Sequence, residues 1–292
     1  MKSTISNEKI TFVSDSFNVE PWELRFNDEA VNYFWRPESI EKLGAAICFP
    51  LLGTLPDNTY SLDGKEYTME THGFAKDFDY AVAEKSETSI SYEINDNEKT
   101  IVQFPYKFRL MVVYTVHDTT LRTEYRVKNL DTREMYFSVG GHPRYACPIG
   151  DGCRFEDCYV EFEKPESPGN IVKSYGPVSI VEKHFSKDGM RVDLDYDMFE
   201  KGCFCLHPVN SGYLMLKNKV DARMTRLNIK GISHLQFWTS VGSPFLALEP
   251  WYGSITSIPA KPIESRWKER PGTLQVNPGE ENSYFFDMII SR

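Results

Sequence analysis

The chain has 292 residues, of which 41% are hydrophobic and 26% are charged, a composition typical of a globular protein. Its formal net charge is -9 and its charged clusters mix both signs, which argues against a nucleic-acid-binding surface. No apolar run approaches the roughly 18 residues that a membrane span requires, so we expect no association with membranes.

The amino-terminal segment, residues 1–8, lacks the apolar stretch of a signal peptide, and we expect a cytoplasmic protein. In that compartment the six cysteines would be reduced. No Cys-x-x-Cys pair occurs, and no two histidines are two or four positions apart. The sequence therefore predicts no metal site.

Strand patterns dominate along the chain. Apolar residues alternate with polar ones in Phe108–Val116 and again in Leu121–Lys128, and the polar turn His117–Thr120 joins the two runs into an expected hairpin. Helical signals are weak, and the best of them is Asp221–Leu227. Further short strands are expected at Thr88–Ile94, Cys158–Phe162, Tyr213–Lys217, His234–Thr239, Phe245–Leu248 and Ser283–Ile290.

The fold class follows from these short strands. Aromatic residues, which favour strands, make up 14% of the chain, and 17 prolines and 18 glycines supply frequent turns. There is no internal repeat and no linker long enough to divide the chain. We expect residues 1–292 to form a single all-β domain, a large antiparallel β-sandwich with a site on the concave face of one sheet.

Three segments place reactive side chains among glycine, proline and aromatic residues: Thr71–Lys76, Ser138–Tyr145 and Leu246–Gly253. In the third segment, Glu249 follows an apolar run, where a carboxylate is costly unless it has a partner or a purpose. We expect Pro250 to end the strand there, so that Glu249 either leaves the core for solvent or performs chemistry.

The histidines of the other two segments, His142 and His72, are each flanked by glycine. An imidazole in such a turn can exchange a proton near neutral pH, although a purely structural role fits as well. His117, His184 and His207 are expected to be structural or solvent-exposed. One glutamate and two histidines suit proton transfer on a hydroxylated substrate, and the absence of a nucleophile elbow disfavours a covalent mechanism.

The order of the three segments resembles the aldose 1-epimerases, the galactose mutarotase-like family, and in particular its LacX-like subgroup. The resemblance runs from about residue 45 to the end of the chain. It also includes Phe49–Gly53, Tyr60–Tyr67, Pro105–Phe108, Val127–Asn129, Asp197–Phe199 and Leu274–Glu280.

The resemblance implies a galactose mutarotase-like supersandwich that interconverts the α and β anomers of a hexose. It implies that Glu249 is the general base, that His142 is the general acid, and that His72 and Asp197 bind the sugar. No metal or redox cofactor is required, the expected partner is a small sugar, and a homodimer is left open. We expect Glu249 and His142 to face each other across one concave pocket, with space for a pyranose ring between them and His72 on the wall.

Three positions depart from the pattern of the family. Thr54 and Lys76 stand where relatives often carry arginine, and Arg144 stands where they often carry a small residue. Lys76, Arg144 and the aromatic Trp251 are expected to contact the substrate.

The departures leave the substrate open. Two cations beside the site favour an anionic group, whereas Thr54 removes a possible anion contact. The sequence therefore favours a neutral aldose, with a hexose 6-phosphate as the alternative. A non-catalytic carbohydrate-binding protein on the same fold is a further alternative. A polysaccharide lyase or hydrolase is disfavoured, because it would need an extended cleft and a hydrolase would also need two carboxylates.

Overall fold

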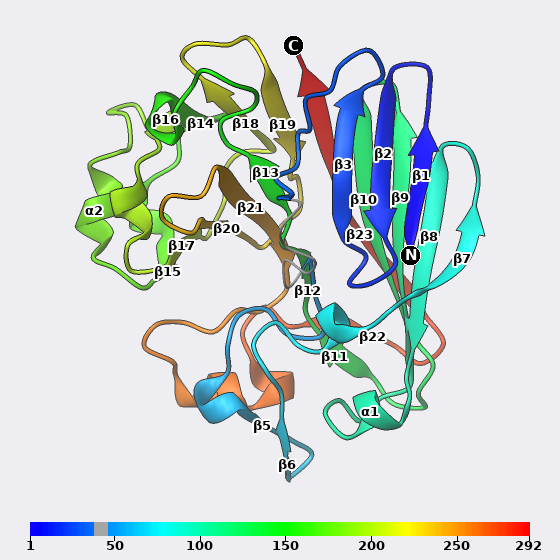
Figure 1. Cartoon of the computed structure of the whole chain (residues 1–292). Helices are drawn as coiled ribbons and strands as arrows, with labels where there is room; N and C mark the ends of the chain where they lie inside the picture. The colour runs from blue at the N-terminus through cyan, green and yellow to red at the C-terminus, as the bar shows by residue number, and fades with distance from the viewer. Residues whose placement is uncertain (38–45) are drawn as a thin grey trace.

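The computed structural model describes residues 1–37 and 46–292, in which strands dominate and neighbouring strands pair antiparallel (Figure 1). The largest sheet has nine strands. Their order is β16 (Arg191–Asp193), β14 (Cys158–Phe162), β18 (Tyr213–Asn218), β19 (Met224–Asn228), β23 (Glu281–Ser291), β10 (Thr120–Asn129), β9 (Phe108–His117), β8 (Ser89–Asn95) and β7 (Ala81–Lys85).

A second large sheet carries the candidate site. Its strands are β15 (Ile171–Ser174), β17 (Cys203–Leu206), β20 (His234–Trp238), β21 (Phe245–Tyr252), β12 (Val139–Gly141) and β4 (Ile47–Cys48), with β13 (Arg144–Ala146) paired to β21 beside β12. Strand β21 therefore has β20 along one edge, and β12 and then β13 along the other.

Three smaller sheets and short helices complete the described part of the chain. The sheets are β1 (Lys2–Ser6), β2 (Ile10–Asp15) and β3 (Pro21–Phe26); β5 (Thr59–Leu62) and β6 (Lys65–Thr68); and β11 (Met135–Phe137) and β22 (Leu274–Val276). The α-helices are α1 (Glu98–Ile101) and α2 (Val178–Glu182). The 3-10 helices are η1 (Pro56–Asn58), η2 (Ala75–Asp77), η3 (Phe155–Asp157), η4 (Pro168–Asn170), η5 (Tyr196–Phe199), η6 (Pro262–Ser265) and η7 (Trp267–Glu269).

The eight strands expected from the sequence are all present, among 23 strands in the described residues. The expected hairpin is present, with Thr120 opposite His117 and the strands β9 and β10 in register along their length. The expected helix at residues 221–227 is wrong, because Met224–Asn228 is strand β19, which pairs with β18 on one side and β23 on the other. No helix of the described residues is long and apolar enough to cross a membrane.

The core lies between the two large sheets. Alternate residues of β20 and β21, including Leu235, Phe237 and Leu248, point into one hydrophobic cluster that extends from Ile5 to Ile290. Phe237 stacks on Phe204 of β17 with ring centroids 4.5 Å apart. Because side chains alternate along a strand, the residues between them occupy the opposite face of the seven-stranded sheet.

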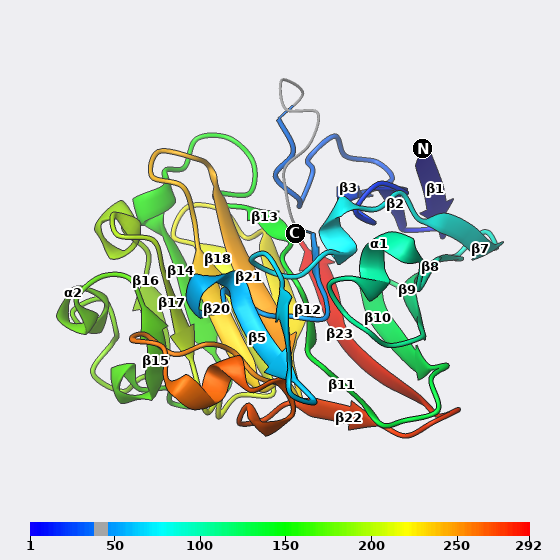
Figure 2. The ribbon, with the colours of Figure 1, turned by 90° about the horizontal axis from the view of Figure 1, so that it is seen from below.

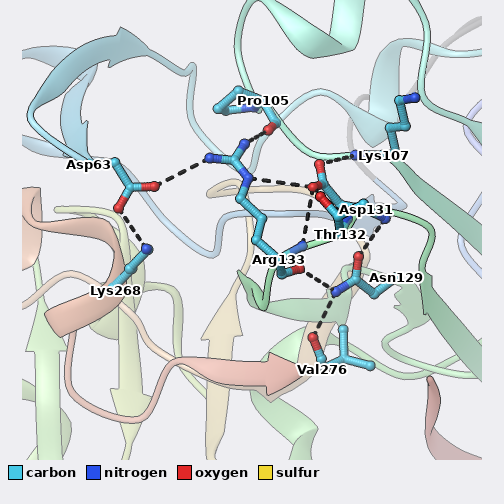
Figure 3. Close-up of polar contacts among 9 residues, drawn as sticks. All are labelled: Asp63, Pro105, Lys107, Asn129, Asp131, Thr132, Arg133, Lys268 and Val276. Carbon is cyan, nitrogen blue, oxygen red and sulfur yellow. Dashed lines mark hydrogen bonds and ion pairs between the residues drawn. The ribbon is translucent and has the colours of Figure 1, made fainter. Parts of the chain in front are cut away.

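A polar network fixes the chain where it leaves β10 (Figure 3). The buried amide of Asn129 donates to the carbonyls of Arg133 and Val276 at 2.8 and 3.0 Å. Asp63, in the β5–β6 turn, contacts Arg133 at 3.3 Å and Lys268 of η7 at 2.6 Å. These contacts tie the β5–β6 hairpin and η7 to the segment that leads into β11 and β12. Helix η7 lies beside β5 (Figure 2).

Candidate active site

The register of the seven-stranded sheet brings residues far apart in sequence into one row. Glu249 of β21 lies opposite Gln236 of β20, Gln236 opposite Cys205 of β17, and Cys205 opposite Lys173 of β15. All four side chains point to the face away from the sandwich core, because directly opposed residues share a face. His142 extends the row at its other end, since it follows β12 two residues after Gly140, which lies opposite Trp251.

The strand that carries Glu249 does not end there, so the expectation for Pro250 is wrong. Strand β21 continues to Tyr252, with Pro250 opposite Leu235. The Trp251 carbonyl accepts from Ser233 on the β20 side, so the nitrogen of Pro250 points the other way. On that side the strand paired with β21 changes from β12 to β13. Pro250 has no N–H to donate, and at this break between the two strands no backbone hydrogen bond is lost.

The carboxylate of Glu249 is fully buried beside the imidazole of His142. The Oε1 of Glu249 lies 3.4 Å from the Nε2 of His142 and accepts from the Nε2 of Gln236 at 3.3 Å. The expected juxtaposition is therefore present. The expected space for a pyranose ring between the two groups is absent, because a separation of 3.4 Å is too short to admit one. A sugar would have to contact both groups from the same side.

Several buried polar atoms of this row have no hydrogen-bond partner among the described residues. They are the second carboxylate oxygen of Glu249, Nδ1 of His142, Oε1 of Gln236 and Nε1 of Trp251. Buried polar atoms are nearly always paired in proteins, so a cluster of unpaired donors and acceptors is suited to a ligand that is itself rich in hydroxyl groups.

Burial favours the neutral form of both partners. It raises the pKa of Glu249 to about 8, against the opposing effects of the Gln236 hydrogen bond and of Arg144 and Lys173. It holds the pKa of His142 well below its usual range, and the charge of Arg144 acts in the same direction. Near neutral pH the pair therefore holds one proton, which resides on the carboxyl group.

His72 stands beside this pair in a left-handed backbone conformation, with a φ of 66°. Its ring is edge-on to His142, with centroids 5.5 Å apart, and to Trp251 at 5.7 Å. The Nδ1 of His72 accepts from the backbone N–H of Gly53 at 3.2 Å. Burial lowers the pKa of His72 to about 3, so the ring is neutral and its proton lies on Nε2, where it can be donated.

The other predicted contact residues differ in their placement. Trp251 is fully buried in a small cluster with Cys48, Leu52, Cys205 and Ile255. Arg144 of β13 lies opposite Ala247, two residues before Glu249 on β21. Its guanidinium is 5.6 Å from the ring of Trp238.

Lys76 in η2 bonds Asp77 at 2.7 Å and also acts on His72 through its charge. Lys76 therefore stands near the site with its own counter-ion.

Asp197 is not brought into this cluster by any contact among the described residues. Its carboxylate lies 2.8 Å from the Nε2 of His184 and forms an ion pair with Lys183. These partners occupy both oxygens, and they lower the pKa of Asp197 against the effect of burial. Its expected role as a sugar ligand stays a prediction.

Two residues of the row, Gln236 and Lys173, were not predicted from the sequence. Gln236 carried a signal, because it is the polar position inside the apolar strand Leu235–Phe237. Lys173 carried none, since a lysine in a short strand is normally solvent-exposed. A register shift between Ile171 and Lys173 turns this lysine onto the site face, and such bulges often redirect a side chain beside a site.

Close backbone contact around Gly140 predicts a sensitive position. A Cβ there would lie 2.5 Å from Trp251 Cδ1 and 2.8 Å from the Pro250 carbonyl oxygen. We expect Gly140→Ala to lower the free energy of unfolding by about 1–3 kcal/mol, the usual cost of overpacking, as measured by urea denaturation. Gly169→Ala is the control, since its Cβ would meet only Ser167 Oγ, at 3.3 Å. Equal stability of the two variants would contradict the close packing.

The buried histidines predict a loss of stability in acid. Burial holds the pKa values of His72 and His234 at about 3, and that of His142 well below 6.5. Below pH 6.5 the unfolded chain binds protons that the folded chain does not, and each histidine costs about 1.4 kcal/mol per pH unit.

Glu249 acts in the opposite sense. With its pKa raised from 4.5 to about 8, it adds stability as the pH falls between those values. Between pH 8 and 6.5 it acts without opposition from the histidines, but below 6.5 three histidines outweigh one carboxyl group. We therefore expect urea denaturation to show maximal stability near pH 6.5, and a steady gain down to pH 5 would contradict this assignment.

Comparison with known proteins identifies relatives over the whole chain. Residues 42–285 match the family model described as aldose 1-epimerase. Protein LacX (chromosomal) of Lactococcus lactis subsp. lactis is 28% identical over 302 residues, which cover 99% of each chain.

Solved structures with the same fold are also found. A galactose mutarotase related enzyme from Lactobacillus acidophilus superposes with a TM-score of 0.87 at 23% identity, covering 100% of this chain and 98% of the other. A galactose mutarotase-like protein from Lactobacillus casei gives 0.84 at 24% identity, with both chains covered completely. Galactose 1-epimerase from Lactobacillus acidophilus gives 0.67 at 12%, covering 99% and 93%. These neighbours bear out the expected all-β, galactose mutarotase-like sandwich.

Proposed function

This chain belongs to the aldose 1-epimerase family, and on that premise we propose that it interconverts the α and β anomers of a hexose. The observation that carries the proposal is the buried pair of Glu249 and His142, 3.4 Å apart, with an unpaired polar atom on each side chain. A carboxylate and an imidazole so placed can remove one proton and deliver another on a single substrate.

The reaction uses the pair in both directions. One group takes the proton of the C1 hydroxyl while the other protonates the ring oxygen, and the C1–O5 bond breaks to give the open-chain aldehyde. Rotation about the C1–C2 bond and reversal of both proton transfers close the other anomer. In the assignment inherited from the resemblance, Glu249 begins as the base and His142 as the acid.

The electrostatics of the site support this exchange. When Glu249 has taken the C1 proton and His142 has given its own, the carboxyl is protonated and the imidazole is neutral. Burial favours that same protonation state, because it raises the pKa of Glu249 and lowers that of His142. The buried site thereby favours the protonation state that accompanies the open chain, and each positioned group contributes about 10²–10⁴ in rate.

The neighbouring side chains would hold the sugar against the pair. The Nε2–H of His72 is available as a donor and the amide of Gln236 can both donate and accept. Trp251 adds an aromatic edge beside them. A cytoplasmic location and a single domain over residues 1–292 stay predictions.

Polarimetry tests the proposal directly. A freshly dissolved pure anomer should approach its equilibrium rotation faster in proportion to the concentration of the protein, over a panel of free and phosphorylated hexoses. Binding of a hexose without any acceleration would instead identify a carbohydrate-binding protein. No acceleration and no binding for the whole panel would refute the proposal.

A further inference from the structure

Lys173 is a buried lysine on the same face of the sheet as the Glu249–His142 pair. The residue is only 4% exposed, and it lies in the row that runs through Cys205 and Gln236 to Glu249. The Lys173 ammonium lies 5.9 Å from the ring of Trp251, and a Cβ on Gly53 would be 3.0 Å from it. The lysine therefore points along the row into the site rather than out to solvent.

No carboxylate or hydrogen-bond acceptor pairs with this ammonium among the described residues. Its contacts are with the faces of two aromatic rings, those of Tyr175 at 5.4 Å and Trp251. A buried ammonium is costly unless an opposite charge compensates it, and such a position is rare without a partner or a function. The missing partner is the observation on which this inference depends.

A second cation without a hydrogen-bond partner in the described chain is Arg144. It lies opposite Ala247 of β21, and its guanidinium is 5.6 and 5.8 Å from the rings of Trp238 and Phe245. Its charge and that of Lys173 both act on the same group, Glu249. The two cations therefore approach the catalytic pair from β13 and β15, on opposite sides of β21.

The cations around the pair differ in the counter-ions that the described residues supply. Glu249 is the only carboxylate in the row, and His142 and His72 are neutral. Lys76 has Asp77 as its counter-ion, and Arg36 has Glu20 at 3.4 Å. Cys48, Cys203 and Cys205 face the row as neutral thiols, because burial raises the pKa of each. Glu20 also acts on Arg144 through its charge, ahead of Glu249. Among the described residues, Lys173 is therefore the cation of the row that has no paired carboxylate of its own.

We propose that the substrate is a hexose carrying an anionic group away from C1, and that Lys173 is the residue that selects it. The inference rests on the proposed function and narrows its substrate class. The anionic oxygens would supply the counter-charge that the described residues lack, while the hydroxyl groups meet the unpaired atoms of Glu249, His142 and Gln236. The expectation of a neutral aldose rested partly on Thr54, which stands where relatives often carry an arginine. In this protein Lys173 of β15 supplies a positive charge beside the preceding residue, Gly53.

The test compares kcat/KM for a free hexose, its 6-phosphate and the corresponding uronate, measured by anomer exchange. The 6-phosphate and the uronate distinguish a phosphate group from a carboxylate as the anion. We expect at least one anionic sugar to exceed the free hexose by more than about tenfold, which is about 1.4 kcal/mol of transition-state stabilisation. A preference for the free hexose, or none, would overturn the proposal.

Lys173→Met keeps the length of the side chain and removes its charge, and we expect it to abolish the preference mainly through KM. Lys217→Met is the matched control, since Lys217 lies on β18 of the other large sheet beside Glu161. If Lys173→Met keeps the preference and Arg144→Gln loses it, the assignment to Lys173 is wrong.

Failure of this inference is distinguishable from failure of the proposed function. If no sugar shows accelerated anomer exchange, the epimerase activity itself is refuted. Calorimetric binding of the same three sugars to wild type and Lys173→Met still measures the selectivity in that case. Tighter binding of an anionic sugar that disappears in the variant supports the role of Lys173, and equal affinities for all three sugars contradict it.

Discussion

Glu249→Gln is expected to lower kcat for anomer exchange by about 10²–10⁴, the usual contribution of a positioned acid or base. The amide has the shape of the carboxylic acid but neither accepts nor releases a proton in the reaction. The fold should persist, because the variant replaces a fully buried ionisable group with a neutral one and retains an amide beside Gln236. Sugar affinity should change little.

The matched control for this variant is Glu166→Gln. Glu166 is also buried, but its carboxylate accepts from the backbone N–H groups of Asn210 and Ser211, both at 2.8 Å, away from the seven-stranded sheet row. We expect its kcat to remain that of wild type. Retention of more than about a tenth of wild-type kcat in Glu249→Gln would exclude Glu249 as an essential proton carrier.

His142→Asn is expected to cause a loss of similar size and to change the pH dependence. The active pair holds one proton, so activity falls when the pair loses it or gains a second. With the pKa of Glu249 raised to about 8, kcat/KM of the wild type should fall above about pH 8. Because the pKa of His142 is well below 6.5, the acid limb should lie well below that value.

His117→Asn is the control, since His117 is the exposed last residue of β9, at the turn to β10. It should keep both the rate and the two limbs of the wild-type profile. In His142→Asn the remaining activity should lose the bell shape, because a single titrating group is left. A flat wild-type profile from pH 5 to 9 would argue against the pair.

Local pattern located most of the longer strands, such as β9, β10 and β23, and was insufficient for the short strands and where pairing overrides it. The segment Asp221–Leu227 has few β-branched residues and looked weakly helical. It nevertheless pairs with β18 on one side and β23 on the other, and it buries Thr225 and Leu227. Tertiary pairing decided its conformation. Pro250 was misread for a related reason, since the break between β12 and β13 that accommodates it is not a local property.

The candidate site divides in the same way. Glu249, His142 and His72 could be predicted because each lies in a motif of glycine, proline and aromatic residues, and a family resemblance connected the motifs. That Arg144 and Lys173 approach the same carboxylate from opposite sides depends on strand register and on one bulge, neither of which a sequence pattern specifies. The 3.4 Å separation of the pair was likewise out of reach, since side-chain packing sets it.

Exchange spectroscopy by NMR on an equilibrated hexose tests the central claim most directly, because it detects anomer interconversion without net change. With wild-type protein and a sugar of the preferred class, exchange peaks between the α and β C1–H signals should appear at mixing times where the sugar alone shows none. Glu249→Gln should abolish these peaks while the sugar still binds. Exchange peaks of equal intensity with wild type and Glu249→Gln would contradict the account.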